Sequence, residues 1–228
     1  VVVAMTVEEA NAAVEDMLSG NRFGEAGSTV VIEEFMDGEE ASLLAFVDGK
    51  TVVPMIASQD HKRIFDGDKG PNTGGMGTYA PAPVLTDALR DEAMKTILEP
   101  MVAAMQKEGM PYVGCLYAGL MITPQGPKVV EFNARFGDPE TQVVLPLLDS
   151  DLGQIMMACA TGTLTADIVK WKDSSAACVI LASKGYPETS SKGDVIHGDI
   201  KQHDTTIVFH SGTKLVGEEY VTNGGRVL

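Results

Sequence analysis

The chain has 228 residues, 44% of them hydrophobic and 21% charged, a composition typical of a soluble globular protein with one large or two small domains. Its 17 basic and 32 acidic residues give a net charge of −15, which argues against a nucleic-acid-binding surface. No apolar run approaches the ~20 residues of a membrane span, and no signal peptide is visible. We therefore expect a cytoplasmic protein without nucleic-acid or membrane partners.

The first third of the chain predicts a helix, three strands and a long loop. The opening residues, Val1 to Met5, read as a strand entered from upstream, so we expect a fragment of a longer protein. The expected elements are a helix that begins with the Thr6-Val7-Glu8-Glu9 capping box and ends at Gly20, a strand over 29–35, a hairpin of 41–47 with 51–57 around Asp48-Gly49, and a Gly-rich loop over 58–83.

The rest of the chain predicts helices, a second hairpin and a smaller β-rich part. The three cysteines, Cys115, Cys159 and Cys178, stand among apolar residues, so we expect buried free thiols. The expected elements are a helix capped by Thr86 and bent at Pro100, a hairpin of 112–122 with 128–132, a helix from Ser150 or Asp151 through Met157, and, beyond a seam at 162–174, strands over 176–182, over 206–210 and near Val227.

The most informative stretch is EFNARFGDPE, residues 131–140. Glu131 and Asn133 are two apart, so on a strand they project to the same face. A carboxylate and an amide oxygen side by side suit a hard cation such as Mg²⁺, which keeps other positions for water and nucleotide phosphate. Arg135 continues the alternation and could bring a positive fork to a phosphoryl group. The alternative is an edge strand with solvated polar residues.

An acidic turn and the Gly-rich loop are two further candidate sites. A strand that enters an exposed turn can offer its backbone groups near Phe35 to adenine. Glu33 or Glu34 could accept a hydrogen bond from the exocyclic amine of adenine, and Glu40 could accept from the ribose hydroxyls. In the loop, the basic pair Lys62 and Arg63, with the glycines of 70–77, could lie over a phosphate as a lid. The alternatives are a charged surface turn and a mobile surface loop. The chain has no P-loop motif.

With these pieces in order, the chain resembles the phosphoribosylamine–glycine ligases, or glycinamide ribonucleotide synthetases, of the ATP-grasp superfamily. The resemblance covers essentially the whole chain. It rests on residues 31–42 (VIEEFMDGEEAS), 59–63 (QDHKR), 70–77 (GPNTGGMG), 116–121 (LYAGLM), 131–140 (EFNARFGDPE), 184–187 (KGYP), 193–198 (GDVIHG) and 223–228 (NGGRVL).

The resemblance implies an α+β protein with a partial ATP-grasp fold of antiparallel sheets and helices, followed by the start of a smaller β-rich domain. We expect an N-terminally truncated ATP-grasp domain over 1–165 and a truncated C-terminal ligase domain over 166–228. Family members carry a further N-terminal domain, and then a lysine and a Gly-rich loop over the ATP phosphates, before the position of Val1.

The resemblance also implies a role for each matching residue. Glu33, Glu34 and the backbone at Phe35 face adenine, Glu40 faces ribose, and Glu131 with Asn133 binds Mg²⁺ or Mn²⁺. The reaction centre holds Arg135 and Asp138. The substrates are bordered by Lys62, Thr73, Gly74, Gly75, Gly137 and Asp138, and the candidates for the ribose 5-phosphate are Lys184, Lys214 and Arg226. Residues 117–121 offer no acidic ligand, so the ligands of a second metal stay open.

The implied activity is ATP-dependent ligation of glycine to 5-phosphoribosylamine through glycyl phosphate, the second step of de novo purine biosynthesis. One alternative is a relative that uses bicarbonate or formate instead of glycine. Another is a fragment that binds nucleotide without catalysis. Expected partners are glycine, 5-phosphoribosylamine, ATP and, beyond these, other purine-pathway enzyme domains.

Overall fold

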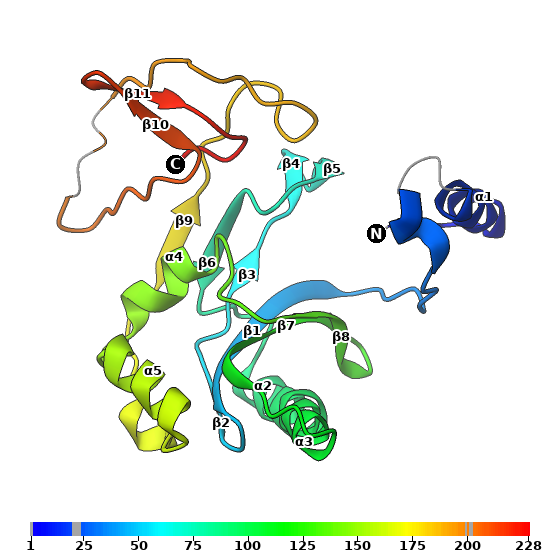
Figure 1. The fold of residues 1–228 in the computed structure, drawn as a ribbon, viewed down its shortest axis with the longest axis vertical. Helices are drawn as coiled ribbons and strands as arrows, with labels where there is room; N and C mark the ends of the chain where they lie inside the picture. Colours follow the sequence, from blue (N-terminus) through cyan, green and yellow to red (C-terminus); the bar gives the residue numbers. More distant parts are fainter. Residues whose placement is uncertain (1, 20–23, 199, 201–202) are drawn as a thin grey trace. The chain divides into compact units, whose positions relative to one another are not determined.

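In the computed structural model, residues 2–19, 24–198, 200 and 203–228 are described, and the contacts divide the chain after Asp37 into two units. The first unit contains α1 (Val7–Leu18) and a 3₁₀ turn over Gly24–Ser28 (Figure 1). The predicted N-cap is confirmed, because the Thr6 hydroxyl accepts the Glu9 amide at 3.2 Å. The Glu9 carboxylate accepts the amide of Met5 at 2.8 Å. Gly20, the predicted helix end, lies outside the described residues.

The predicted strand over 29–35 is wrong. These residues form no strand, and none of the described segments pairs with them. Val31 and Ile32 are each 79% exposed within this structure. A β-strand needs a hydrogen-bonded neighbour, and apolar β-branched residues alone do not provide one.

The second unit, from Gly38 onward, is built on a four-stranded antiparallel sheet in the order β2-β1-β7-β8 (Figure 1). Both predicted hairpins are confirmed: Val47 pairs with Val52 in the first, and Thr123 with Gly126 in the second. The long strands β1 and β7 lie side by side in the middle. The four strands are β1 (Glu39–Asp48), β2 (Val52–Pro54), β7 (Val113–Thr123) and β8 (Gly126–Asn133).

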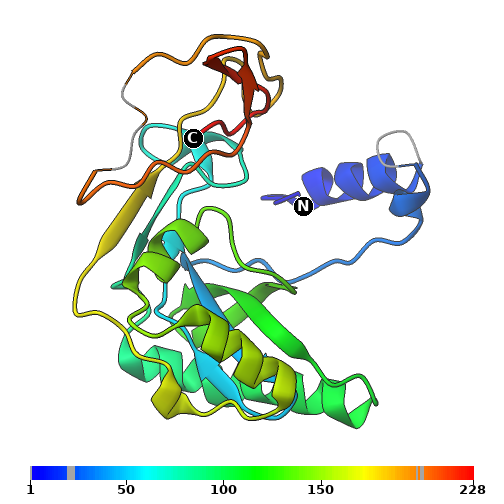
Figure 2. The same cartoon turned by 60° about the vertical axis from the view of Figure 1, so that its left-hand side comes forward.

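Helices cover both faces of this sheet, which explains why residues 41–47 of β1 are buried without interruption (Figure 2). Leu43 packs with the helices that follow Thr86, and Phe46 packs with α5 on the other face. The helices are α2 (Asp87–Ala93), a π-helical turn over Met94–Leu98, α3 (Glu99–Lys107), α4 (Thr141–Val144), a 3₁₀ turn over Leu145–Leu147, and α5 (Leu152–Thr161).

The helix predictions around Thr86 and Asp151 are confirmed. The Thr86 hydroxyl accepts from Leu89, and the Asp151 carboxylate accepts the Gln154 amide at 3.1 Å. The wide π-helical turn ends at Leu98, two residues before Pro100, which has no amide hydrogen to continue the regular ladder.

The prediction of a long loop over 58–83 is wrong. It contains four short strands, which form a two-stranded ribbon, β4-β5, and part of a three-stranded sheet, β3-β6-β9. Thr78 of β6 pairs with Cys178 of β9, so a distant segment completes this sheet. The strands are β3 (Gln59–Asp60), β4 (Arg63–Phe65), β5 (Lys69–Asn72), β6 (Gly77–Ala80) and β9 (Ala176–Val179).

After β9, the described chain forms a hairpin of β10 (Thr213–Val216) and β11 (Glu219–Thr222) (Figure 1). The strand predicted over 206–210 is wrong, because only Thr206 joins an isolated bridge there. Near the predicted strand at Val227, Arg226 forms a single bridge with Ala182. The hairpin turns at Gly217, whose φ of 63° suits glycine. The boundary between 165 and 166 stays a prediction.

Two further predictions concern cysteines and membranes. The cysteines are free thiols, buried at Cys115 and Cys159 and half-buried at Cys178. None of the helices in the described ranges is long and apolar enough to cross a membrane.

Candidate functional site

The predicted metal ligands lie together at the end of β8. The Asn133 amide donates to a Glu131 carboxylate oxygen at 3.0 Å, so the two side chains share one face of the sheet. The register changes nearby, where Gly119 of β7 pairs with Glu131 but Leu120 pairs with Val129. This β-bulge determines which side chains of β8 project to each face of the sheet after it. Glu131 is exposed, so the pair is open to solvent.

The chemistry of this pair fits a hard divalent cation. A half-turn of the Asn133 amide would place its oxygen beside the Glu131 carboxylate. Among the described residues there is no cluster of three or more His, Cys, Asp or Glu side chains able to hold a metal. Two oxygen ligands from the protein, with water and phosphate completing the shell, are a usual arrangement for Mg²⁺.

Arg135 lies just beyond the strand, because β8 ends at Asn133. Its guanidinium donates to the Phe136 carbonyl at 3.0 Å and stands 5.9 Å from the centroid of the Tyr117 ring. Arg135 therefore does not continue the strand alternation as predicted. The side chain is exposed, and a guanidinium carries five N–H donors, so an anion could still bind it.

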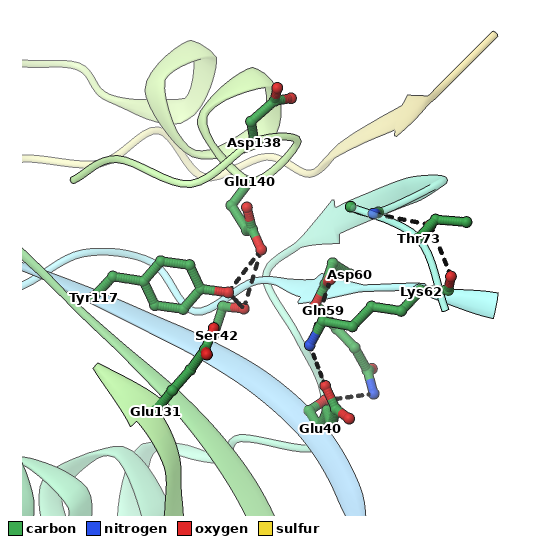
Figure 3. A network of polar contacts seen from close by, with 12 residues as sticks. Glu40, Ser42, Gln59, Asp60, Lys62, Thr73, Tyr117, Glu131, Asp138 and Glu140 are labelled. Atoms are coloured by element: carbon green, nitrogen blue, oxygen red, sulfur yellow. Dashed lines mark hydrogen bonds and ion pairs between the residues drawn. The ribbon is translucent and has the colours of Figure 1, made fainter. Parts of the chain in front are cut away.

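Behind this surface, Ser42, Tyr117 and Glu140 form a buried polar cluster (Figure 3). The Tyr117 hydroxyl donates to the Glu140 carboxylate at 2.8 Å and lies 2.8 Å from the Ser42 hydroxyl, which is 3.4 Å from the same carboxylate oxygen. Glu140 is only 3% exposed. Burial, together with the negative charge of Glu140, raises the pKa of Tyr117 well above its ordinary value.

Lys62 lies between two carboxylates in the same region (Figure 3). It forms a hydrogen-bonded ion pair with Glu40, and its ammonium nitrogen is 3.8 Å from an Asp60 oxygen. Burial raises the pKa of Asp60 by more than Lys62 lowers it. Burial lowers the pKa of Lys62, but Asp60, Glu40 and Glu140 together raise it above its ordinary value. The predicted ribose ligand Glu40 and phosphate ligand Lys62 are thus partners of each other.

The Gly-rich loop is fixed by hydrogen bonds on both sides. Thr73 donates from its amide and its hydroxyl to the Lys62 carbonyl, each at 2.7 Å, and its hydroxyl accepts the Gly75 amide at 3.0 Å. Gly75 has a φ of 111°, and a Cβ there would lie 2.5 Å from the Pro139 ring. Glycine is therefore required by both the backbone and the neighbouring chain.

Asp138 is held from two directions. One carboxylate oxygen accepts from the Gln142 amide at 2.8 Å, and the other accepts from Arg226 at 3.1 Å. A cavity of about 440 Å³ opens beside it. Gly137, at the cavity wall, has no room for a side chain, because a Cβ there would lie 2.1 Å from a Glu140 oxygen. The other lining residues are Thr141, Gln142, Leu145, Pro146, Phe209 and His210.

The remaining predicted residues are not brought into this cluster. Lys184 and Lys214 are exposed, and no hydrogen bond or ion pair joins their side chains to the described part of the protein. Glu33, Glu34 and Phe35 are exposed residues of the first unit, and they are described with that unit alone.

Residues that the sequence did not single out complete the site. Buried polar side chains inside apolar strands were the available signal for Ser42 and Tyr117, since such groups are retained when they have partners. The others, apart from Gln142, lie within motifs that carry the family resemblance, but no pattern gave them a role. They are Asp60, Glu140, Gln142 and Tyr186, whose hydroxyl accepts the Gly74 amide at 3.0 Å.

Comparison with known proteins shows similarity to one family over the whole chain. The family model described as phosphoribosylglycinamide synthetase, ATP-grasp (A) domain, matches residues 1–141, and the C-domain model of the same synthetase matches 176–228. Phosphoribosylamine–glycine ligases of Halalkalibacterium halodurans and Caulobacter vibrioides are 55% and 57% identical over the whole chain. The chain spans about half the length of these curated relatives, 53% and 54% respectively.

Solved structures give the same picture. The phosphoribosylamine–glycine ligase of Thermotoga maritima superposes with a TM-score of 0.84 at 31% identity, over 99% of this chain and 56% of that one. The biotin carboxylase domain of a Hydrogenobacter thermophilus 2-oxoglutarate carboxylase has a TM-score of 0.62 at 14% identity, over 96% of this chain and 49% of that one, and shares the ATP-grasp fold alone. The chain therefore belongs to the phosphoribosylglycinamide synthetase family, whose ATP-grasp domain model covers most of its length.

Proposed function

We propose that the protein carrying this chain joins glycine to 5-phosphoribosylamine with ATP, giving glycinamide ribonucleotide, ADP and phosphate, the second step of de novo purine biosynthesis. The observation that carries the proposal is the Glu131–Asn133 pair at the end of β8, with Arg135 and Asp138 close behind it in the chain. The whole-chain similarity to proteins named phosphoribosylamine–glycine ligase supports this choice of acid and amine.

Glu131 and Asn133 would hold Mg²⁺ or Mn²⁺, which when bound offsets phosphate charge during phosphoryl transfer. In the first step, a glycine carboxylate oxygen forms a bond to the γ-phosphorus, and the bond between that phosphorus and the β–γ bridging oxygen breaks, releasing ADP. Arg135 supplies a positive fork for the transferring group, because its exposed guanidinium retains donors beyond the Phe136 carbonyl.

In the second step, the amine nitrogen of 5-phosphoribosylamine bonds to the glycyl carbonyl carbon, the acyl C–O bond breaks and phosphate leaves. The amine must then lose a proton. Asp138 is the proposed acceptor, because its carboxylate is about half exposed, borders the cavity and is held in place on both oxygens.

The remaining assignments stay predictions. We propose that adenine contacts Glu33, Glu34 and the backbone at Phe35, and that Glu40 reaches ribose while paired with Lys62. Thr73, Gly74, Gly75 and Gly137 would border the substrates, and Lys184 and Lys214 remain candidates for the ribose 5-phosphate. We also propose a cytoplasmic location and association with other purine-pathway enzyme domains.

Glycine-dependent release of ADP by the full-length protein tests the proposal. Glu131→Ala should abolish it, whereas Glu108→Ala, which removes an exposed carboxylate after α3, should leave it unchanged. Replacement of glycine by bicarbonate or formate should give no ADP. If Glu131→Ala keeps turnover within a few-fold of the parent, the metal assignment is wrong.

A second candidate is favoured by the length of the chain, which covers only about half of its relatives. The 228 residues alone would then bind nucleotide without completing the reaction. Calorimetry with Mg-ADP, together with a turnover assay on the same 228-residue protein, separates the possibilities. Binding without turnover supports the second candidate, and measurable turnover excludes it.

A further inference from the structure

We infer that Arg226 is a positioning residue: it fixes the Asp138 carboxylate and the Gly74 peptide relative to each other and does not bind the ribose 5-phosphate. The inference rests on the proposed function, and it gives Arg226 a different role from the one that the sequence implied. It follows from three hydrogen bonds that one guanidinium makes to two segments far away in the chain.

The guanidinium has little freedom for a further ligand. One terminal nitrogen donates to the carbonyls of Gly74 and Asp138, both at 2.7 Å, and the other donates to the Asp138 carboxylate at 3.1 Å. Three of its five N–H donors are therefore used, and the side chain is only 21% exposed. An arginine whose planar guanidinium meets several acceptors cannot be replaced by a side chain that carries its charge at a single point.

The surroundings also oppose a phosphate at this position. The acceptors around Arg226 are two carbonyl oxygens and one carboxylate, all of which carry negative partial or full charge. A phosphate dianion would have to displace these groups or stand beside the Asp138 carboxylate, and like charges at such distances repel. The positive charge of Arg226 is thus already directed to Asp138.

The C-terminal part of the chain also holds the amide of Gly74. The Tyr186 hydroxyl accepts the Gly74 amide at 3.0 Å while Arg226 donates to the Gly74 carbonyl. A Cβ at Gly74 would lie 3.0 Å from the guanidinium carbon, and one at Gly225 would lie 2.3 Å from the Tyr186 ring. The C-terminal segment therefore packs closely on the Gly-rich loop.

Asp138 consequently depends on two separate parts of the protein. Gln142 of α4 holds one carboxylate oxygen, and Arg226, 88 residues from Asp138 in sequence, holds the other. Loss of Arg226 would leave Asp138 bound on one side only and would release the Gly74 carbonyl. Small misplacements of a reacting group can cost about 100-fold in rate, which makes the arrangement measurable in kinetics.

Steady-state kinetics of the full-length ligase tests the inference. For Arg226→Ala we expect kcat to fall about 100-fold, while KM for 5-phosphoribosylamine changes by less than about threefold. Arg226→Lys should be nearly as slow, because a single ammonium nitrogen does not reproduce the planar fork whose two terminal nitrogens meet these acceptors. A matched control is Arg90→Ala, which removes ion pairs to Asp87 and Asp91 on α2 and should leave both constants unchanged.

A double-mutant comparison makes the coupling explicit. In an Asp138→Asn background, Arg226→Ala should lower kcat by far less than the about 100-fold expected in the parent, because the shared carboxylate contact is already changed and only the two carbonyl contacts remain to be lost. If Arg226 bound the 5-phosphate, Arg226→Ala would raise KM for 5-phosphoribosylamine at unchanged kcat, and Arg226→Lys would restore KM. The effects of Arg226→Ala and Asp138→Asn would then multiply in the double variant. That pattern would overturn the inference.

Failure of the proposed function would be recognised separately. If the unmutated protein makes no glycinamide ribonucleotide, the function is wrong whatever the variants do. Urea unfolding of the parent, both single variants and the double variant then still measures the contact between Arg226 and Asp138 without any substrate. A non-additive shift of the unfolding midpoint supports the contact, and additive shifts contradict it.

Discussion

The hydroxyl of Tyr117, on β7, donates a hydrogen bond of 2.8 Å to the Glu140 carboxylate, and both side chains lie in the interior below the proposed reaction centre. The described structure shows hydroxyl groups as the partners of this carboxylate, with Ser42 as the second at 3.4 Å. A buried carboxylate that loses its donor retains the cost of desolvation. The pair therefore links the stability of the main sheet to the position of residues 137–140.

Tyr117→Phe should destabilise the protein by about 1–3 kcal/mol, because it keeps the ring but removes the donor to Glu140. Urea unfolding followed by circular dichroism measures the change. Tyr220→Phe is the matched control, since that residue is 36% exposed, and it should shift the free energy of unfolding by less than about 0.5 kcal/mol. Equal effects of the two substitutions would show that the hydrogen bond from Tyr117 to Glu140 contributes nothing to the free energy of unfolding.

Gly75→Ala should destabilise the protein by more than the strain of a positive φ alone explains. The position has a φ of 111°, and the new Cβ would lie 2.5 Å from the Pro139 ring, next to Asp138. Gly49→Ala provides the control, because Gly49 has a φ of 98° but its nearest neighbour would be 3.8 Å away. We expect about 1–3 kcal/mol of strain at either site and a larger loss at Gly75, measured by urea unfolding.

The outcome at Gly75 also has a functional readout. If the loop presses on Pro139 as the structure shows, Gly75→Ala should lower glycine-dependent ADP release in the full-length protein, while Gly49→Ala should not. A Gly75 variant as stable and active as the Gly49 variant would mean that the loop and Pro139 do not touch in solution.

Much of the fold was predictable because its signals are local. The N-caps at Thr86 and Asp151 depend on side chains three residues from the amides that they accept, and the turn at Asp48-Gly49 is a strong hairpin signal. The pairing of Glu131 with Asn133 was likewise predictable, since it requires only the two-residue period of a strand.

The rest depended on contacts between distant segments, which no periodicity reveals. Strand β6 forms with β9 as its neighbour, and Thr78 pairs with a residue as distant as Cys178, so the Gly-rich stretch read alone as a loop. The strand predicted over 29–35 failed for the converse reason, because no described segment pairs with it. Charge alone indicated a phosphate ligand at Arg226, whereas the acceptors that support the inferred positioning role lie far away in the sequence.

Asp60 should make stability fall as pH rises toward neutrality. Burial raises the pKa of Asp60, so the folded state holds this proton more tightly than the unfolded state does. Between the ordinary pKa of 3.8 and the raised value, each increase in pH therefore favours the unfolded state, and above that window the full cost of the buried charge remains. Asp60→Asn removes the titration but keeps the shape.

We therefore expect Asp60→Asn to gain stability relative to the parent as the pH is raised from about 4 to 7, measured by urea unfolding at several pH values. Asp66→Asn, at an exposed position, should show no such trend. A difference between Asp60→Asn and the parent that is constant with pH would mean that Asp60 titrates alike in the folded and unfolded states.

Asp48 should show the opposite dependence. Its carboxylate accepts the amides of Lys50 at 3.0 Å and Thr51 at 2.7 Å within the hairpin turn, and its second oxygen accepts the Leu164 amide at 3.1 Å. Burial raises the pKa of Asp48, but these amide donors lower it by more, so the folded-state value lies below 3.8. The stabilisation is therefore present above pH 3.8 and is lost as the pH falls through the folded-state pKa.

Asp48→Asn should cost about 1–2 kcal/mol at neutral pH, because an amide has one oxygen acceptor and cannot serve both the turn and Leu164. The loss should shrink as the pH falls below 3.8, where the parent carboxylate becomes protonated too. Urea unfolding across this range measures it, with the exposed Asp173→Asn as a variant expected to match the parent throughout. If the stability lost in Asp48→Asn instead increased as the pH falls, the ionised Asp48 carboxylate would not be what connects the β1–β2 turn to the residues after α5.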